Sequence, residues 1–321
     1  MQRKRDLVSC IVPVLNEEET ILNFILSLHR QDYRPIELII VDGGSMDDTI
    51  NIINTSRDDL NDESFSLRFF EEKDFGTIAS PANARNIGLD KAEGEFIFFI
   101  DSDTCFISNS TISAAITEIG NRDFIIIYFK PIIDTKLEEY ISKTIKMDGI
   151  ILYRKRIIKN IRFNPTLGFG EDREFNFRLF GNLRFDGQIP CSETIGRHHP
   201  HTKTELKRQN EWYGRTIIRY LSAVYPVNKK EFVNQTSYVF YNFFTGLFPF
   251  FLIISLVILP RFAIILLILF TAQILVRFLK YKWNNLDQYV FLIWYSIFNG
   301  FFFIKGMILG SYKKNIAGRN S

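Results

Sequence analysis

The sequence predicts an α/β domain with a doubly wound, mostly parallel sheet, followed by transmembrane helices. Two observations predict this class. In the first two thirds of the chain, short apolar runs rich in Ile, Val and Phe alternate with segments of helical periodicity, as in sheets whose parallel strands are joined by helices. The last 90 residues are nearly free of acids and contain 15 of the 32 Phe residues.

The charge of the chain changes sign at about residue 231. Residues 1–231 contain 31 Lys and Arg against 35 Asp and Glu, whereas residues 232–321 contain 8 basic residues and one acid, Asp287. The net charge of +3 and the mean hydropathy of +0.01 therefore average over two unlike parts. This composition excludes a disordered or fibrous chain, and we expect no nucleic acid among the partners.

The N-terminal part is expected in the cytoplasm. The three cysteines, Cys10, Cys105 and Cys191, are odd in number and widely spaced, which argues against a disulfide framework and against a zinc site. The apolar run after the basic N-terminus contains Pro13 and is too short for a signal peptide.

Five apolar runs have the length and composition of buried strands. They are residues 7–15, 36–41, 67–70, 96–100 and 124–129. Helices are expected between the first three runs, at residues 17–30 and from about 47 to 55. Because ligands bind at the carboxyl ends of the strands in such sheets, the polar residues that follow each run are the candidate site residues.

Acidic residues follow three of these strands. The first strand is followed by Asn16-Glu17-Glu18, the second by Asp42-Gly43-Gly44-Ser45 and the fourth by Asp101-Ser102-Asp103. Asp and Gly also favour turns and helix N-caps, so one such position alone would carry little weight. Three acidic strand ends on one edge of the sheet indicate a functional site there.

These motifs, taken in order, resemble those of the family 2 glycosyltransferases, whose catalytic domain has the GT-A (Rossmann-like) fold. The resemblance covers roughly residues 6–200. Its motifs are Ile11-Val12-Pro13-Val14-Leu15-Asn16-Glu17, Val41-Asp42-Gly43-Gly44-Ser45, Ala84-Arg85-Asn86-Ile87-Gly88, Asp101-Ser102-Asp103 and Gly170-Glu171-Asp172. Each motif alone is common, but the ordered set is specific. It implies a nucleotide-sugar glycosyltransferase domain over residues 1–202.

The resemblance implies a UDP- or GDP-sugar donor and a Mg²⁺ or Mn²⁺ ion. Two carboxylates one residue apart after a strand offer the oxygen ligands that such cations prefer, and the cation would be shared with the donor diphosphate. Asp103 is then the main metal ligand, and Asp101 lies nearer the ribose. The other residues implied around the donor are Pro13, Asn16, Glu17, Asp42, Gly44, Arg85 and Ser102. Asp42 would contact the base or ribose and Arg85 a phosphate, unless Arg85 is a surface residue or pairs with an acid.

Asp172 resembles the catalytic base of the inverting members, which takes a proton from the acceptor hydroxyl during the displacement. Its neighbour Glu171 is the alternative base. An acceptor that is already a phosphate needs no strong base, and Asp172 would then position the acceptor or contact the metal. The family also places a histidine near the diphosphate, so either His198 or His199 is expected as a further metal ligand; the alternative is a polar loop.

The remainder of the chain is expected at a membrane. Residues 203–225 combine basic side chains with Trp and Tyr, which predicts an amphipathic interfacial helix that, with its connector, reaches residue 230. Within it, Gln209-Asn210-Glu211-Trp212 resembles the QxxRW motif of processive polysaccharide synthases. Glu211 stands where that motif has Arg, and this difference disfavours a processive enzyme.

The segment 231–321 is predicted to be a transmembrane region. Two spans are expected at about 238–259 and 262–280, each near the length that crosses a bilayer. A third apolar segment at about 289–311 is interrupted by Lys305 and is ambiguous, since it could span or lie at the interface. A third span would place the final basic residues outside, against the positive-inside rule.

The sequence as a whole predicts a membrane-anchored, metal-dependent, inverting glycosyltransferase with its catalytic domain on the cytoplasmic side. The expected acceptor is membrane-proximal and polyprenyl-linked, either a glycan on polyprenyl diphosphate or polyprenyl phosphate itself. The alternatives are a processive polysaccharide synthase-like transferase and a non-catalytic membrane scaffold with the same fold. A sugar nucleotidyltransferase is disfavoured because the loop after the first strand is acidic and contains no Gly.

Overall fold

The computed structural model describes residues 6–76, 79–144, 149–158, 160–181, 190–198, 200, 202–283 and 286–317. The chain forms two compact units, one of Met1–Ile132 with Met147–His199 and the other of Ile133–Lys146 with Pro200–Ser321. The expected division at residues 202 and 230 stays a prediction, and the structure adds that the segment Ile133–Lys146 clusters with the second unit.

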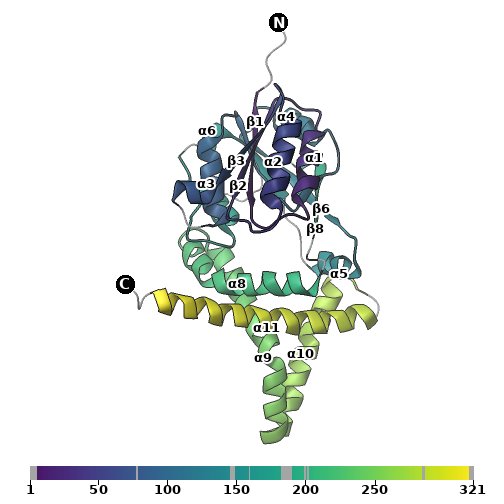
Figure 1. Ribbon diagram of the computed structural model, residues 1–321. Helices are drawn as coiled ribbons and strands as arrows, with labels where there is room; N and C mark the ends of the chain where they lie inside the picture. The colour runs from purple at the N-terminus through teal and green to yellow at the C-terminus, as the bar shows by residue number, and fades with distance from the viewer. Residues whose placement is uncertain are drawn as a thin grey trace. The chain divides into compact units, whose positions relative to one another are not determined.

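The described part of the first unit is built on one eight-stranded sheet (Figure 1). In sheet order the strands are β3 (Phe65–Glu71), β2 (Ile36–Asp42), β1 (Val8–Val14), β4 (Phe96–Phe99), β7 (Gly149–Arg154), β6 (Phe124–Ile132), β8 (Pro190–His198) and β5 (Thr104–Phe106). The pairs β3–β2, β2–β1, β1–β4 and β6–β8 are parallel, whereas β7 is antiparallel to β4 and β6, and β5 is antiparallel to β8. All five predicted strands are present, and the class is confirmed.

Helices cover both faces of this sheet (Figure 1). One face carries α1 (Ile21–His29), α2 (Thr49–Leu60) and α4 (Thr111–Ile119), and the other carries α3 (Pro81–Lys91), α6 (Lys155–Ile158) and α7 (Glu171–Phe180). The short helix η1 (Glu72–Phe75) follows β3. Strand side chains alternate between faces, so Cys10 and Val12 lie in one core and Ile11 in the other.

The contact between α3 and β1 depends on Gly88. A Cβ atom at this position would overlap Cγ2 of Ile11, which is fully buried. The absence of a side chain therefore lets α3 lie close against the sheet. This close packing fixes where the other residues of α3, among them Arg85, stand relative to the strand ends.

The described part of the second unit is helical. Its elements are α5 (Lys136–Thr144), α8 (Lys203–Val224), α9 (Lys229–Ile258), α10 (Pro260–Lys280) and α11 (Leu286–Ala317). By length and composition, α9, α10 and α11 (over Leu286–Gly310) could each cross a membrane. The third apolar segment, which was ambiguous in sequence, is thus a helix that is long enough to span.

Within this unit α8 and α11 lie side by side and run in the same direction (Figure 1). Asn210 Nδ2 donates to Asn299 Oδ1 at 3.0 Å, and four residues further along both helices a Cβ at Gly214 would overlap the carbonyl oxygen of Phe303. One helical turn on α8 therefore corresponds to one turn on α11. The antiparallel pair α9 and α10 forms a hairpin that α11 crosses, where a Cβ at Gly246 would overlap the α11 backbone.

Candidate active site

The candidate site residues gather at the edge of the sheet where β1, β2 and β4 end. These three strands are parallel neighbours, so their carboxyl ends and the loops that follow meet on one side. α3 brings Arg85 to the same edge, and the first turn of α7 brings Glu171 and Asp172. The strand-end interpretation of the sequence therefore selected residues that the fold brings together.

The turn after β4 presents two carboxylates. The backbone N–H and the hydroxyl of Thr104 both donate to the carbonyl of Asp101, at 3.2 and 2.8 Å, which closes the turn. Ser102 is buried, whereas the side chains of Asp101 and Asp103 are 30% and 35% exposed. Both carboxylates can therefore meet a ligand that approaches this edge.

Arg197 on β8 contacts both aspartates. Its Nη2 lies 3.1 Å from Asp101 Oδ2, and its Nε lies 3.2 Å from Asp103 Oδ2. The position follows from sheet pairing, because Arg197 is opposite Thr104 in the antiparallel β5–β8 pair. The sequence interpretation considered only the histidines of this segment and missed Arg197, although the run Gly196-Arg197-His198-His199 was a usable signal.

Burial and cations act in opposite directions on this pair. Burial raises the pKa of Asp101, but the positive charges of Arg197 and Arg85 lower it by a larger amount. The pKa of Asp101 therefore lies below its ordinary value. Burial raises the pKa of Asp103 above its ordinary value, although Arg197 opposes the shift. Of the two aspartates, Asp103 is therefore the one whose charged form the surrounding residues stabilise less.

The two carboxylates fit a divalent cation that is shared with a phosphate ligand. Asp103 Oδ1 is buried and has no hydrogen-bond partner among the described residues, and an oxygen in that state is costly unless a donor or a cation meets it. The described residues contain no cluster of three or more His, Cys, Asp or Glu for a metal. Mg²⁺-like sites commonly use one or two carboxylates and complete their shell with phosphate and water.

The described residues do not test the predicted histidine ligands of the metal. His198 is the last residue of β8, but its side chain lies outside the description, and so does the whole of His199. A metal-binding role for one of them stays a prediction.

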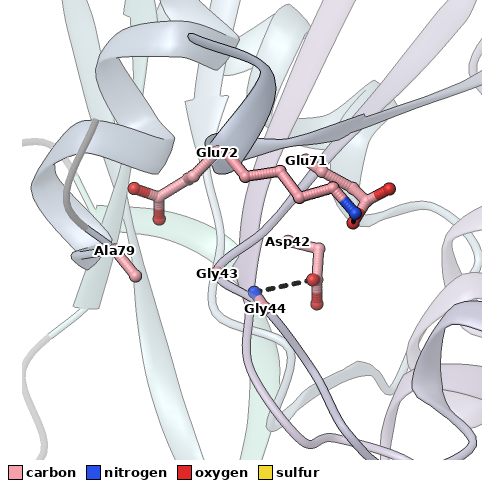
Figure 2. A pocket seen from close by; sticks show the side chains of 7 residues that line it. Asp42, Gly43, Gly44, Glu71, Glu72 and Ala79 are labelled. Carbon is pink, nitrogen blue, oxygen red and sulfur yellow. Dashed lines mark hydrogen bonds and ion pairs between the residues drawn. The ribbon is translucent and has the colours of Figure 1, made fainter. Parts of the chain in front are cut away.

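A small cavity bordered by acidic side chains lies where β2 and β3 end. Asp42 Oδ2 accepts from the N–H groups of Gly44 and Ser45, at 2.7 and 2.9 Å. Gly44 has φ of +101°, a conformation that glycine adopts without a steric penalty. Figure 2 shows the carboxylates of Asp42 and Glu72 on either side of the Gly43–Gly44 backbone.

The cavity has a volume of about 90 Å³. Its lining consists of Asp42, Gly43, Gly44, Glu71, Glu72, Lys73 and Ala79. Three carboxylates, of Asp42, Glu71 and Glu72, border this cavity, and carboxylate oxygens can accept from the N–H and O–H groups of a base or a sugar ring. Glu71 and Glu72 were not among the predicted site residues, although they directly follow the expected strand of residues 67–70 and the strand-end rule could have found them.

The loop after β1 packs against the loop after β2. Asn16 has φ of 56°, its N–H donates to Ser45 Oγ at 2.8 Å, and its Oδ1 accepts from Met46 N–H at 2.9 Å. Pro13 is half-buried within β1, opposite Val41 of β2. These bonds fix the first loop against the cavity side of the site.

Glu17 faces the Asp101-Ser102-Asp103 turn. Burial raises the pKa of Glu17, and the charges of Asp103 and Asp101 raise it further, while hydrogen bonds from Thr20 and Ser102 lower it. The net pKa lies above the ordinary value for Glu. Glu17 thus belongs to the same acidic group as the two aspartates.

Arg85 connects the two halves of the site. It is buried, its Nη2 lies 2.6 Å from Asp101 Oδ1, and its Nη1 forms an ion pair with Glu171. Burial lowers the pKa of Arg85, but Glu171 and Asp101 raise it more, so Arg85 stays charged. The structure therefore places Arg85 between two acids, and its contact with a phosphate stays a prediction.

The two adjacent acids at the start of α7 lie in different environments. Glu171 is buried, and burial raises its pKa to about 7 against the opposing effect of Arg85. Asp172 is exposed, and its Oδ1 accepts from Arg173 N–H at 2.7 Å. Only Asp172 of the two is open to an incoming molecule, and the helix N-terminus stabilises its negative charge.

The fold and the site have the features of a GT-A-type transferase. These are a doubly wound sheet, paired aspartates after β4, a cavity beside β2 and a Glu-Asp pair at the start of α7. The family model "Glycosyl transferase family 2" matches residues 9–181, which is more than half of the chain. The chain belongs to this family.

Curated relatives match parts of the chain. An uncharacterized glycosyltransferase of Haemophilus influenzae is 46% identical over 106 residues, which are 33% of this chain and 39% of that protein. The poly(ribitol-phosphate) beta-N-acetylglucosaminyltransferase TarS of Staphylococcus aureus is 30% identical over 193 residues, 54% of this chain and 32% of its own. The chain thus spans less than two thirds of these relatives' length.

A third relative acts, by its name, on a lipid-linked glycan. It is the GalNAc(5)-diNAcBac-PP-undecaprenol beta-1,3-glucosyltransferase of Campylobacter jejuni, 25% identical over 198 residues, which cover 56% of this chain and 61% of that protein.

Solved structures share the fold. The mannosyltransferase PcManGT from Pyrobaculum calidifontis, in complex with GDP-Man and Mn²⁺, superposes with a TM-score of 0.57 at 14% identity, over 97% of this chain and 88% of that one. Glucosyl-3-phosphoglycerate synthase from Mycobacterium tuberculosis, with Mn²⁺ and UDP, gives 0.50 at 18% identity, over 68% and 80%. The expected GT-A fold is confirmed.

Proposed function

We propose that this protein is a membrane-anchored, metal-dependent, inverting glycosyltransferase that moves a sugar from a UDP- or GDP-sugar to a lipid-linked acceptor at the cytoplasmic membrane face. The observation that carries this proposal is the bridge through Arg85, which ties Asp101 on the donor side to the first turn of α7 on the acceptor side. The bridge makes one site of two motifs that are 70 residues apart in sequence.

The donor would lie along the edge of the sheet. Asp101 and Asp103 would hold Mg²⁺ or Mn²⁺, which supplies the positive charge that stabilises the departing nucleoside diphosphate. The cavity beside Asp42 would take the nucleoside, with Gly44 allowing close approach of the backbone and Pro13, Asn16, Glu17 and Ser102 forming the adjoining wall.

Asp172 would act on the acceptor. Its exposed carboxylate takes the proton of the acceptor hydroxyl while that oxygen bonds to the anomeric carbon and the bond to the diphosphate oxygen breaks on the opposite face. A single displacement of this kind inverts the anomeric configuration. Glu171 is buried against Arg85, so it serves to position Arg85, and we assign the base to Asp172.

The helical unit supports a surface-bound anchor with a membrane hairpin. α8 carries six charged residues between Glu205 and Arg219, which is incompatible with a span, and α11 lies along it with Lys305 Nζ 2.8 Å from Glu211 Oε1. We therefore assign α8 and α11 to the membrane surface and only α9 and α10 to the bilayer. Lys280 and Lys282 then lie on the cytoplasmic side, as the positive-inside rule prefers.

A transfer assay tests the proposal. Purified protein in detergent is incubated with each radiolabelled nucleotide-sugar, with Mn²⁺ or EDTA, and with polyprenyl phosphate or a polyprenyl-diphosphate glycan; lipid products are separated by thin-layer chromatography. We expect one donor to yield a metal-dependent lipid product whose anomeric configuration is inverted. Asp103→Ala is expected to abolish the product without loss of fold. If cells that carry Asp103→Ala keep the wild-type glycan, the non-catalytic scaffold replaces the enzyme.

A further inference from the structure

Arg277 lies near one end of the membrane hairpin. The 15 residues between Arg261 and Arg277 are uncharged. At about 1.5 Å per helical residue, the two arginines are about 24 Å apart along α10. The hydrocarbon core of a bilayer is about 30 Å thick, so the two residues stand near its opposite boundaries. Arg277 therefore lies close to the hydrocarbon boundary on the side where α10 ends, from where its long side chain can reach toward lipid phosphates.

Arg277 contacts Tyr241 of α9 and Tyr281, the residue that follows α10, and Tyr241 links it to α11. Its guanidinium donates to Tyr241 Oη of α9, and the guanidinium carbon lies 4.4 Å from the Tyr241 ring centroid and 5.8 Å from that of Tyr281. Tyr241 Oη in turn donates to Ser296 Oγ of α11 at 2.7 Å. Arg277 is thus held within the junction of α9, α10 and α11, and its side chain is half-buried.

No described carboxylate lies within ion-pair distance of Arg277. Lys305 of α11 differs from Arg277 in this respect, because its charge is neutralised by Glu211 of α8. Phenol rings do not neutralise the charge of a guanidinium. Of its five N–H groups, most therefore stay available to donate to a ligand. Ionisable groups in such places commonly serve a ligand.

A further N–H donor lies near Arg277, because both residues have Tyr281 as a neighbour. Trp283 is 6% exposed, and its Nε1 has no hydrogen-bond partner in the described part of the chain. Its ring centroid is 5.6 Å from that of Tyr281, which also contacts Arg277. A buried indole N–H normally finds an acceptor. The junction therefore offers a fixed cation and a nearby N–H donor, and it lacks an anion.

We propose that Arg277, together with Trp283, binds the phosphate of the lipid-linked acceptor. This inference rests on the proposed function, and it adds the place where the acceptor is held. A guanidinium binds a phosphate through two parallel N–H donors, which neutralises the charge and fixes the geometry. The exposed Lys280 at the end of α10 can meet any headgroup, whereas Arg277 is half-buried against Tyr241 and Tyr281, which restricts the approach of a phosphate to it.

Lipid binding without a donor tests the site. Full-length protein in phosphatidylcholine nanodiscs is titrated with a polyprenyl phosphate, and bound lipid is counted by native mass spectrometry. We expect Arg277→Gln to weaken binding on the order of tenfold, the loss expected for charge-assisted hydrogen bonds. Arg277→Lys should retain part of the affinity, and Trp283→Phe should lower it by a smaller factor. The matched control is Lys280→Gln, an exposed cation three residues away, whose affinity should be unchanged.

Two results overturn the inference. One is wild-type affinity in Arg277→Gln at an unchanged melting temperature. The other is an equal loss, in Arg277→Gln, of binding to phosphatidylglycerol and to the polyprenyl phosphate, which would make Arg277 a general headgroup contact. Failure of the proposed function is a separate result, since it appears as a wild-type protein that transfers no sugar even though it binds the lipid. In the transfer assay, Arg277→Gln should raise KM for the lipid and leave kcat near wild type.

Discussion

Arg197 and the metal would use the same oxygens. The guanidinium contacts Asp101 Oδ2 and Asp103 Oδ2, so a cation that binds both carboxylates must displace it or share them. We expect Arg197→Gln to bind Mn²⁺ several-fold more tightly in the absence of nucleotide, because a competing positive charge is gone. Titration followed by electron paramagnetic resonance of free Mn²⁺ measures this.

The control for Arg197 is Arg156→Gln, which removes one positive charge from an exposed pair with Asp123. Its Mn²⁺ affinity should equal that of the wild type. A weaker affinity in Arg197→Gln would mean that Arg197 organises the carboxylates for the metal and does not compete with it.

Glu171 should give the reaction a pH dependence near neutrality. Burial raises its pKa to about 7, so the carboxylate is ionised and paired with Arg85 only above that pH. As the pH falls through about 7, the carboxylate takes a proton, Arg85 is held less firmly, and kcat/KM should fall. In Glu171→Gln this inflection should disappear and the rate should be lower throughout.

Asp172→Asn provides the comparison for the pH profile. It should lose most activity at every pH, because the exposed carboxylate is the assigned base. An inflection near 7 that persists unchanged in Glu171→Gln would assign it to another group.

Sequence patterns were enough to propose most residues of the candidate site but not how they pair. Asp42, Asp101, Asp103 and Asp172 stand at or just after strand ends or at a helix start, so local patterns point to them. Arg197 is 94 residues from Asp103, and only the pairing of β8 with β5 brings them together. Arg85 was found by its motif, but its burial between two acids depends on tertiary packing.

At the scale of elements, the contact of α3 with β1 should be sensitive to a single methyl group. Gly88→Ala places a Cβ into Cγ2 of Ile11, within a packed core, and overpacking of this kind typically costs about 1–3 kcal/mol. We expect a lower melting temperature and reduced turnover, because Arg85 on the same helix is displaced.

Gly120→Ala is the control for adding a methyl group that meets no neighbouring atom, since nothing lies within 4 Å of its Cβ position. Gly120 has φ of +50°, so its loss of stability comes from backbone strain alone and should leave turnover of the folded protein unchanged. Equal loss of turnover in both variants would contradict a specific role for the α3 contact.

The strands that were predicted from sequence are long and apolar, whereas those that were missed are short or polar. The five predicted strands are the long apolar runs, and they lie in the two cores. β5 has only three residues, and β8 is largely polar, so neither shows a strand pattern. α3 contains Ala, Asn, Arg and Gly in place of a large apolar stripe, and its close fit to the sheet stabilises it instead.

At the scale of the whole molecule, the assignment of α9 and α10 to the bilayer fixes which side each part reaches. A cysteine at Leu259, the exposed residue between the two helices, should react with a membrane-impermeant maleimide added outside intact cells. A cysteine at Ile308 of α11 should not react, although it is equally exposed in the protein. A C-terminal tag should be reached only after the cells are opened.

Labelling of the C-terminal tag from outside would instead assign three spans. Composition alone could not decide between these topologies, because α11 is long and apolar enough for either. The deciding observation is its register along the charged helix α8, which is a property of packing between residues about 89 positions apart.

The common direction of α8 and α11 has an electrostatic consequence. Each helix carries a macrodipole equivalent to about half a positive charge at its N-terminus, and antiparallel neighbours would largely cancel. Here the two add, and in the proposed arrangement the pair is a single dipole that lies in the plane of the bilayer surface, with its positive pole where Lys203 and Leu286 begin the helices. An anionic lipid headgroup that comes within about one turn of that pole would be stabilised by both helices together.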